Sequence, residues 1–514
     1  MTAKQSFLKG TVILIIAGLI TRVIGFFNRI IMVRLIGEEG IGIYNMAIPT
    51  LFLMYTLSQI GLPIAISKRV AEAKAQNKPT QIKQILIVSL IITGLTSLLL
   101  VGIIIIAAPY IANYLLTDRR TLYPLLAMTP MIPITGLTSV LRGYFQGLQN
   151  MKPQSYAQVL EQIVRIATIH FFVNLLLPYG IEFAVVGAML SGIAGEVISF
   201  LFLASYFKRY KMTDYKSQFF LSFKKAKDTI QSLFSVAIPS TGSRIISSVS
   251  AFLEPVLVAQ SLSFAGFTST VATKQYGILT GYAMPLLFFP TFITHALGIA
   301  LMPNISEADA RHAVGTIHYR INQAIRISFV SGAIATVALL LFTDPILTLM
   351  FDSDQAAYLI RFLAPFYLFV YVQFPLISAL QALDFAKVAM RNTFISTLVK
   401  YVVLVSLTSQ SSLGIFGTVI ALAVTAIFTT LMHYYSLKKV IGYQLKWIDQ
   451  AKMICLIGMT YLTGKILIGW IPHDQTNLIH LLLLLIILTI LYFFYVFLLK
   501  VITFSELKPL LRKR

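Results

Sequence analysis

The sequence predicts an all-α protein that crosses a membrane many times. Of its 514 residues, 57% are apolar and only 12% are charged. Soluble domains carry about 25% charged residues, so this composition excludes a soluble enzyme, a coiled coil and a disordered scaffold. Long apolar runs recur along the whole chain, and no segment between them is large enough to fold as a catalytic domain with its own core.

The apolar runs define the individual helices in order. A spanning helix needs about 20 predominantly apolar residues. Runs that meet this length predict about fourteen transmembrane helices, near 10–36, 41–66, 84–106, 123–147, 156–177, 183–206, 231–262, 275–302, 323–342, 358–383, 392–412, 413–436, 450–470 and 478–499. The first run follows Lys4 and Lys9 without a signal-peptide cleavage pattern, so we expect an uncleaved first span.

The basic residues indicate the orientation of these helices. Lysine and arginine total 41, against 19 aspartates and glutamates. One set of alternating loops holds 27 basic residues, whereas the other holds only Arg119, Arg120 and Lys274. Short cytoplasmic loops of membrane proteins are enriched in Lys and Arg. The asymmetry therefore predicts that both termini are cytoplasmic, and it accounts for the basic excess without a nucleic-acid partner.

A weak internal repeat indicates two lobes. Residues 62–75 resemble 297–310 at an offset of 235, and 21–24 resemble 243–246 at an offset of 222. A displacement of six spans preserves direction, so the pattern indicates parallel repeats related by an axis along the membrane normal; chance similarity of apolar segments is the alternative. The expected domains are an N-terminal six-helix lobe (1–206), a basic cytoplasmic linker (207–230), a C-terminal six-helix lobe (231–440), and two extra transmembrane helices with a basic tail (441–514).

Arginines inside the spans are the main functional signal. An arginine at the centre of a spanning helix costs about 2.5–3.5 kcal/mol on insertion scales. Arg22 and Arg29 are seven residues apart and share a helix face, and Arg244 is the repeat partner of Arg22. Because guanidinium groups bind phosphate oxygens in pairs, these three predict a diphosphate site in a wet central cavity. Lys400 would add positive potential there.

Structural ion pairs are the alternative explanation of these charges. Only Glu161, Glu196 and Glu254 are expected deep in the membrane, which is too few to neutralise every intramembrane base. Glu161 and Arg165 have the i, i+4 spacing of an ion pair within one helix. We therefore interpret that pair as structural and the cavity arginines as an anion site.

Two further titratable residues are candidates for ion coupling. Glu254 precedes Pro255, which we expect to interrupt the helix and free backbone carbonyls. An acid beside an interrupted helix suits a coupling proton or cation, but Glu254 fits equally well as the counter-charge of Arg244. His295 is able to titrate near neutral pH, although a lone histidine is more often a core residue.

Several signals of other chemistries are missing from the sequence. Cys455 is the only cysteine, so neither an intramolecular disulfide nor a thiolate metal cluster is possible. Residues 458–466 lack the spacing of a phosphate-binding loop, and no hydrolase signature occurs. We therefore expect no metal, cofactor or nucleotide, and a membrane potential or an ion gradient of protons or sodium as the driving force.

Three stretches resemble a known group of exporters. They are "TRVIGFFNRIIMVRLIGEEGIGIYNMA", "LRGYFQGLQNMKPQSYAQVLEQIVRI" and "KQYGILTGYAMPLLFFPTFITHALGIALMPNISEA". The chain resembles the multidrug/oligosaccharidyl-lipid/polysaccharide exporter superfamily, in the branch of stage V sporulation protein B and the MurJ-type lipid II flippases. The first-helix arginine of that branch matches Arg22, whereas Asn28 stands where a second arginine is expected, with Arg29 after it.

The resemblance implies a function. It implies a lipid II flippase of the bacterial cytoplasmic membrane that moves an undecaprenyl-pyrophosphate-linked peptidoglycan precursor by alternating access for spore cortex synthesis. It also implies that the last two helices hold the lipid tail, with membrane lipids and cell-wall synthesis enzymes as partners. The alternatives are an exporter of another lipid-linked polysaccharide, a cation-coupled drug exporter, a membrane polymerase and a non-transporting scaffold.

Overall fold

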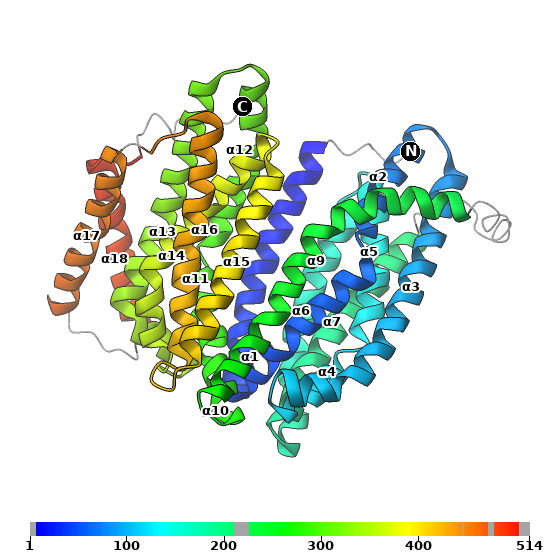
Figure 1. Cartoon of the computed structure of the whole chain (residues 1–514), viewed down its shortest axis with the longest axis horizontal. Coiled ribbons are helices and arrows are strands. Elements are labelled where there is room, and N and C mark those ends of the chain that lie inside the picture. Colours follow the sequence, from blue (N-terminus) through cyan, green and yellow to red (C-terminus); the bar gives the residue numbers. More distant parts are fainter. Residues whose placement is uncertain (1–6, 210–225, 446, 471–476, 503–514) are drawn as a thin grey trace. The chain divides into compact units, whose positions relative to one another are not determined.

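The computed structural model describes residues 7–209, 226–445, 447–470 and 477–502, and all regular structure in these ranges is helical (Figure 1). The predicted all-α polytopic fold is therefore confirmed. By internal contacts the chain forms two compact units, Met1–Gly277 (unit 1) and Ile278–Arg514 (unit 2). The predicted lobe boundaries stay a prediction, because contact units and sequence repeats measure different properties. Most of the predicted basic linker lies outside the described residues.

The helices of unit 1 are α1 (Phe7–Gln59), α2 (Leu62–Ala75), α3 (Pro79–Tyr110), η1 (Ile111–Leu115), η2 (Arg119–Thr121), α4 (Leu122–Ala127), α5 (Met131–Gly147), α6 (Lys152–Leu176), η3 (Leu177–Tyr179), α7 (Ile181–Arg209), α9 (Ala226–Phe264) and α10 (Ser269–Gly277). Those of unit 2 are η4 (Ile278–Ala283), α11 (Met284–Phe288), α12 (Thr291–Ala310), α13 (Val314–Phe351), α14 (Ala357–Ala382), α15 (Ala386–Thr408), α16 (Ile415–Ile441), α17 (Trp447–Trp470) and α18 (Leu478–Leu498).

Fewer described helices qualify as membrane spans than the about fourteen that the sequence predicts. Ten described helices are long and apolar enough to cross a membrane, or up to 12 if two bent helix pairs each form one span. Helix α1, which carries Arg22 and Arg29, is not among them; its two halves, on either side of Gly37, cover the first predicted span and most of the second.

The break inside α1 occurs at a glycine. Gly37 has φ 64° and ψ −170°, a conformation open to glycine because it has no Cβ. A second glycine then lets α1 approach α10: a Cβ on Gly42 would lie 2.1 Å from the carbonyl oxygen of Thr273. The second half of α1 is therefore held against α10 within unit 1.

Small residues also bring α6 and α7 together. A Cβ on Gly187 would lie 2.4 Å from the carbonyl oxygen of Phe172, and a Cβ on Gly195 would lie 2.7 Å from that of Glu161. Gly195 directly precedes Glu196. The close contact of the two backbones therefore places two acidic residues of different helices next to each other.

Candidate functional site

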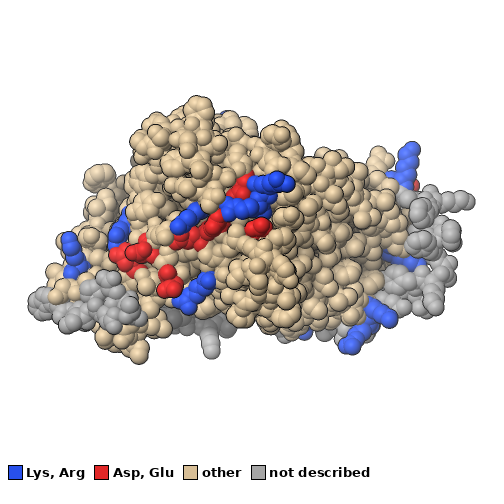
Figure 2. Space-filling view, turned by 90° about the horizontal axis from the view of Figure 1, so that it is seen from below, with Lys and Arg blue, Asp and Glu red and all other residues tan. Residues whose placement is uncertain are grey.

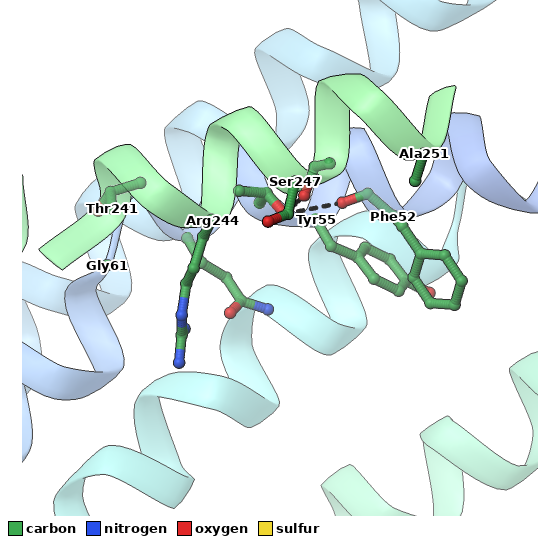
Figure 3. Close-up of a pocket in the computed structure, with 10 residues that line it drawn as sticks. Phe52, Tyr55, Gly61, Thr241, Arg244, Ser247 and Ala251 are labelled. Carbon is green, nitrogen blue, oxygen red and sulfur yellow. Dashed lines mark hydrogen bonds between the residues drawn. The ribbon is translucent and has the colours of Figure 1, made fainter. Parts of the chain in front are cut away.

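A pocket of about 430 Å³ lies between α1 and α9 within unit 1 (Figure 3). It is lined by Phe52, Tyr55, Thr56, Gln59, Gly61, Thr241, Arg244, Ser247, Ser248 and Ala251. The hydroxyls of Thr56 and Ser248 lie 2.6 Å apart and join the two helices. The lining therefore combines one cation with several neutral hydrogen-bonding groups.

Arg244 gives this pocket its charge. Its side chain is exposed and extends from α9 (Figure 3), and it has no carboxylate within ion-pair distance among the described residues. A guanidinium group that no acid neutralises attracts anions, and its planar fork matches two phosphate oxygens. The pocket is therefore suited to a diphosphate or another oxyanion.

The other two predicted arginines do not line this pocket. Arg22 is exposed on α1 and, like Arg244, makes no ion pair with a described carboxylate. Arg29 is half-buried and donates a 2.9 Å hydrogen bond from Nη2 to Oδ1 of Asn45, across the break at Gly37. Asn28, which replaces the arginine of the related branch, is buried.

Arg29 and Glu254 lie near a common residue. Tyr276 of α10 is buried and within electrostatic range of both charges. Glu254 lies ten residues after Arg244 on the same helix, about 15 Å along its axis. Its predicted role, either a coupling site or the counter-charge of Arg244, stays a prediction.

Helix α9 stays helical from Ala226 to Phe264, through Pro255, so the predicted interruption beside Glu254 is wrong for this structure. In unit 2, the ring of His295 packs edge-on against Phe374 with centroids 5.3 Å apart, and Nζ of Lys400 lies 5.0 Å from the ring centroid of Tyr401. Their predicted roles stay predictions.

A partly buried charge network that we call the Arg–Glu network joins three helices of unit 1: Arg142 of α5, Glu161 and Arg165 of α6, and Glu196 of α7. Nη2 of Arg142 lies 3.3 Å from Glu161 and 3.7 Å from Glu196. Nη2 of Arg165 lies 3.7 Å from Glu161, which gives the i, i+4 contact that their spacing predicts. Sequence reasoning assigned no role to Arg142 or Glu196. The presence of two arginines and two glutamates within three successive spans could have indicated ion pairs between these helices.

A second charge cluster surrounds the loop between η1 and η2. Asp118 is buried and accepts hydrogen bonds from the Thr273 hydroxyl at 2.6 Å and from Nη2 of Arg120 at 2.8 Å. Arg120 also pairs with Glu39, and Lys274 lies 3.1 Å from Glu38. Figure 2 shows acidic and basic side chains gathered together on the face seen from below. These contacts connect α10 with the start of the second half of α1, directly through Lys274 and Glu38 and indirectly through Asp118 and Arg120.

The electrostatics of Asp118 reflect a balance of opposing effects. Burial on its own raises the pKa of a carboxyl group, but the hydrogen bonds from Arg120 and Thr273 and the charge of Arg120 outweigh it, so the pKa of Asp118 is lowered below its usual value. The carboxylate is therefore charged in the folded protein and contributes to its stability.

The matches to known proteins agree with this architecture. Residues 7–309 match the family described as "Polysaccharide biosynthesis protein". The chain belongs to this polysaccharide biosynthesis family. Residues 245–406 also match the MatE family. The predicted resemblance to the exporter superfamily is confirmed by these matches and by the relatives that follow.

Relatives of this chain occur in Bacillus subtilis (strain 168). "Stage V sporulation protein B" is 48% identical over 455 residues, which are 88% of each chain. "Sporulation protein YkvU" is 30% identical and covers 84% of this chain and 95% of its own. "Lipid II flippase MurJ" is 23% identical and covers 88% and 86%, respectively.

Solved structures share the fold at low identity. "Lipid II flippase MurJ, inward closed conformation" aligns with a TM-score of 0.67 at 14% identity, over 97% of this chain and 99% of its own. The inward-facing conformation of a multidrug resistance MATE family transporter of the MOP superfamily aligns with a TM-score of 0.66 at 18% identity, over 82% and 94%. Members of the polysaccharide biosynthesis family and of the MATE family thus share one helical architecture.

Proposed function

We propose that this chain is a flippase that moves a lipid-linked saccharide precursor across the bacterial cytoplasmic membrane. It is a transport protein rather than an enzyme, in keeping with the flippase and the transporter that it resembles. The observation that carries the proposal is the pocket of unit 1, in which Arg244 stands among hydroxyl and amide groups without an acid in the lining. Such a lining favours an anionic head group over a cation.

The proposed cargo is an undecaprenyl-pyrophosphate-linked peptidoglycan precursor such as lipid II, supplied to the spore cortex. Two of the relatives carry sporulation in their names, and a third is a lipid II flippase. The diphosphate would bind Arg244, with Arg22 and Arg29 of α1 adding positive potential on its path. Cell-wall synthesis enzymes would act on the same lipid and are the proposed partners.

The lipid tail would stay in the membrane along α17 and α18. Both helices present large apolar side chains to their surroundings, among them Ile454 and Leu462 of α17 and Leu482 and Ile490 of α18. A polyprenyl chain is as apolar as these side chains, so it loses nothing by leaving the bilayer for such a surface. This arrangement would keep the tail in lipid while the head group moves.

The proposed driving force is the membrane potential or an ion gradient, and the transport cycle is alternating access. Moving one elementary charge across 100 mV is worth about 2.3 kcal/mol. A diphosphate carries negative charge, so its export is favoured by a potential that is negative inside. Both termini are proposed to be cytoplasmic because the basic loops share that side.

A drug exporter is the second candidate, because residues 245–406 match the MatE family. A cationic drug needs an acidic or aromatic binding surface. The aromatic side chains Phe52 and Tyr55 line the pocket, but Arg244 would repel a cation there. Efflux of a cationic dye from vesicles that hold the protein would favour this candidate over the flippase.

The test is lipid II translocation in reconstituted vesicles. The charge reversal Arg244→Glu is compared with Arg320→Glu, which changes an exposed arginine outside the pocket. We expect Arg244→Glu to lower the translocation rate at least about tenfold, because one hydrogen bond to a charged group is worth about 1.5–3 kcal/mol, and Arg320→Glu to leave it unchanged. Normal translocation by a folded Arg244→Glu protein would refute the role of the pocket.

A further inference from the structure

The Arg–Glu network has equal numbers of opposite charges but incomplete hydrogen bonding. Glu196 is only 4% exposed, and its Oε1 lies 3.7 Å from Nη2 of Arg142 but accepts no hydrogen bond of ordinary length from a described residue. The Nε groups of Arg142 and Arg165 are also buried without hydrogen-bond partners in the described chain. Buried polar atoms normally have partners, and each that lacks one costs about 1–3 kcal/mol. A buried carboxylate oxygen thus has unused capacity to bind a ligand.

The chemistry of the network selects a proton as this ligand. Glu161 and Glu196 both approach the same atom, Nη2 of Arg142, so the two carboxylates lie close to each other. Two carboxylates in such a site hold a proton between them because two negative charges at short range repel each other. A metal ion would be repelled by Arg142 and Arg165, and no group of three metal-ligating side chains occurs among the described residues.

The network is adjacent to the pocket through one residue. Tyr55 of α1 lines the pocket (Figure 3), and its side chain is within electrostatic range of Glu196 and Arg165. A change of charge in the network therefore acts on Tyr55, a side chain of the pocket lining.

We propose that Glu161 and Glu196 together bind one exchangeable proton, and that this proton raises the affinity of the adjacent pocket for an anionic head group. The second part rests on the proposed function. The proton adds to a carboxylate oxygen and no other bond breaks, so the network changes from neutral to a net charge of +1. The charged and titratable groups that face the pair are Arg142 from α5, Arg165 from α6 and Tyr55 from α1.

Proton and head-group binding are then thermodynamically linked, and each increases the affinity for the other by the same factor. Neutral glutamine at position 196 imitates the protonated state. Glu196→Gln is therefore expected to bind the head group tightly at every pH, whereas loss of a purely structural carboxylate would weaken binding or folding instead.

The experiment measures lipid II binding to the full chain in nanodiscs as a function of pH. Lipid II is a suitable probe because its diphosphate is a diester whose charge does not change over the neutral range. We expect the native affinity to rise at least about fivefold as pH falls, and Glu196→Gln to show the high affinity without the pH dependence. Glu182→Gln, a change at the start of the same helix and outside the network, is the control and should behave as the native protein.

A second measurement separates this proposal from the proposed function. Infrared difference spectra of the native protein between high and low pH should show the C=O band of a buried carboxylic acid, which Glu196→Gln removes. If lipid II does not bind but this band is present and lost in the variant, the proton site is supported and the flippase proposal fails. If Glu196→Gln keeps the native pH dependence or the band, the proton site is refuted. Glu161→Gln serves as the second variant if Glu196→Gln does not fold.

Discussion

The cluster around Asp118 yields a quantitative prediction for Asp118→Asn. The Asp118 side chain is 3% exposed, and it receives hydrogen bonds from Thr273 at 2.6 Å and from Nη2, Nε and the backbone amide of Arg120 at 2.8, 3.0 and 3.0 Å. Breaking a buried ion pair costs about 3–5 kcal/mol. Because the Arg120 side chain is 25% exposed and also pairs with Glu39, we expect a smaller loss in the free energy of unfolding, about 2–3 kcal/mol.

The pH dependence gives this prediction a second readout. The folded-state pKa of Asp118 is lowered, so its stabilisation is present above the unfolded value of about 3.9 and is lost as pH falls through the folded value. The difference in unfolding free energy between the native protein and Asp118→Asn should therefore be constant near neutral pH and shrink below about pH 4.

The assay is denaturation of the purified protein in mixed micelles by increasing SDS, followed by the loss of helical circular dichroism. Asp354→Asn is the control, because Asp354 is exposed and forms no ion pair among the described residues. Equal stability of Asp118→Asn and the native protein at neutral pH would refute the reasoning. A stability difference that persists unchanged in acid would refute the electrostatic part of it.

Two further predictions concern packing. Gly42→Ala should destabilise unit 1 by about 1–3 kcal/mol, because its Cβ would lie 2.1 Å from the carbonyl oxygen of Thr273, whereas Gly94→Ala, with open space around its Cβ, should be neutral or slightly stabilising in the same SDS titration. Tyr371→Phe should lower the free energy of unfolding by about 1–2 kcal/mol, because the buried Tyr371 hydroxyl donates a 2.7 Å hydrogen bond to the carbonyl oxygen of Leu287. Unchanged denaturation midpoints for Gly42→Ala and Tyr371→Phe would contradict these assignments.

Much of the fold is predictable from the sequence because each helix depends on residues that are neighbours along the chain. Apolar runs of sufficient length locate the spans, and the spacing of Glu161 and Arg165 predicts a contact that the structure contains at 3.7 Å. Both inferences use only the rise and periodicity of one helix. The break at Gly37 and the continuity of α9 through Pro255 were not predictable in this way, because neighbouring helices decide whether a glycine or a proline interrupts a helix.

In the candidate site, too, some features follow from the sequence and others only from the packing of helices. The sequence by itself determined that Arg244, Glu161 and Glu196 would lie in membrane helices, because their positions within apolar runs fix their depth. Only the tertiary structure decided that Arg244 shares a pocket with Tyr55, and that Arg142 reaches acids on two other helices. Contacts between helices depend on which faces meet and how closely, as where Gly195 lets α7 touch the backbone of α6, and this is a property of the packed helices together.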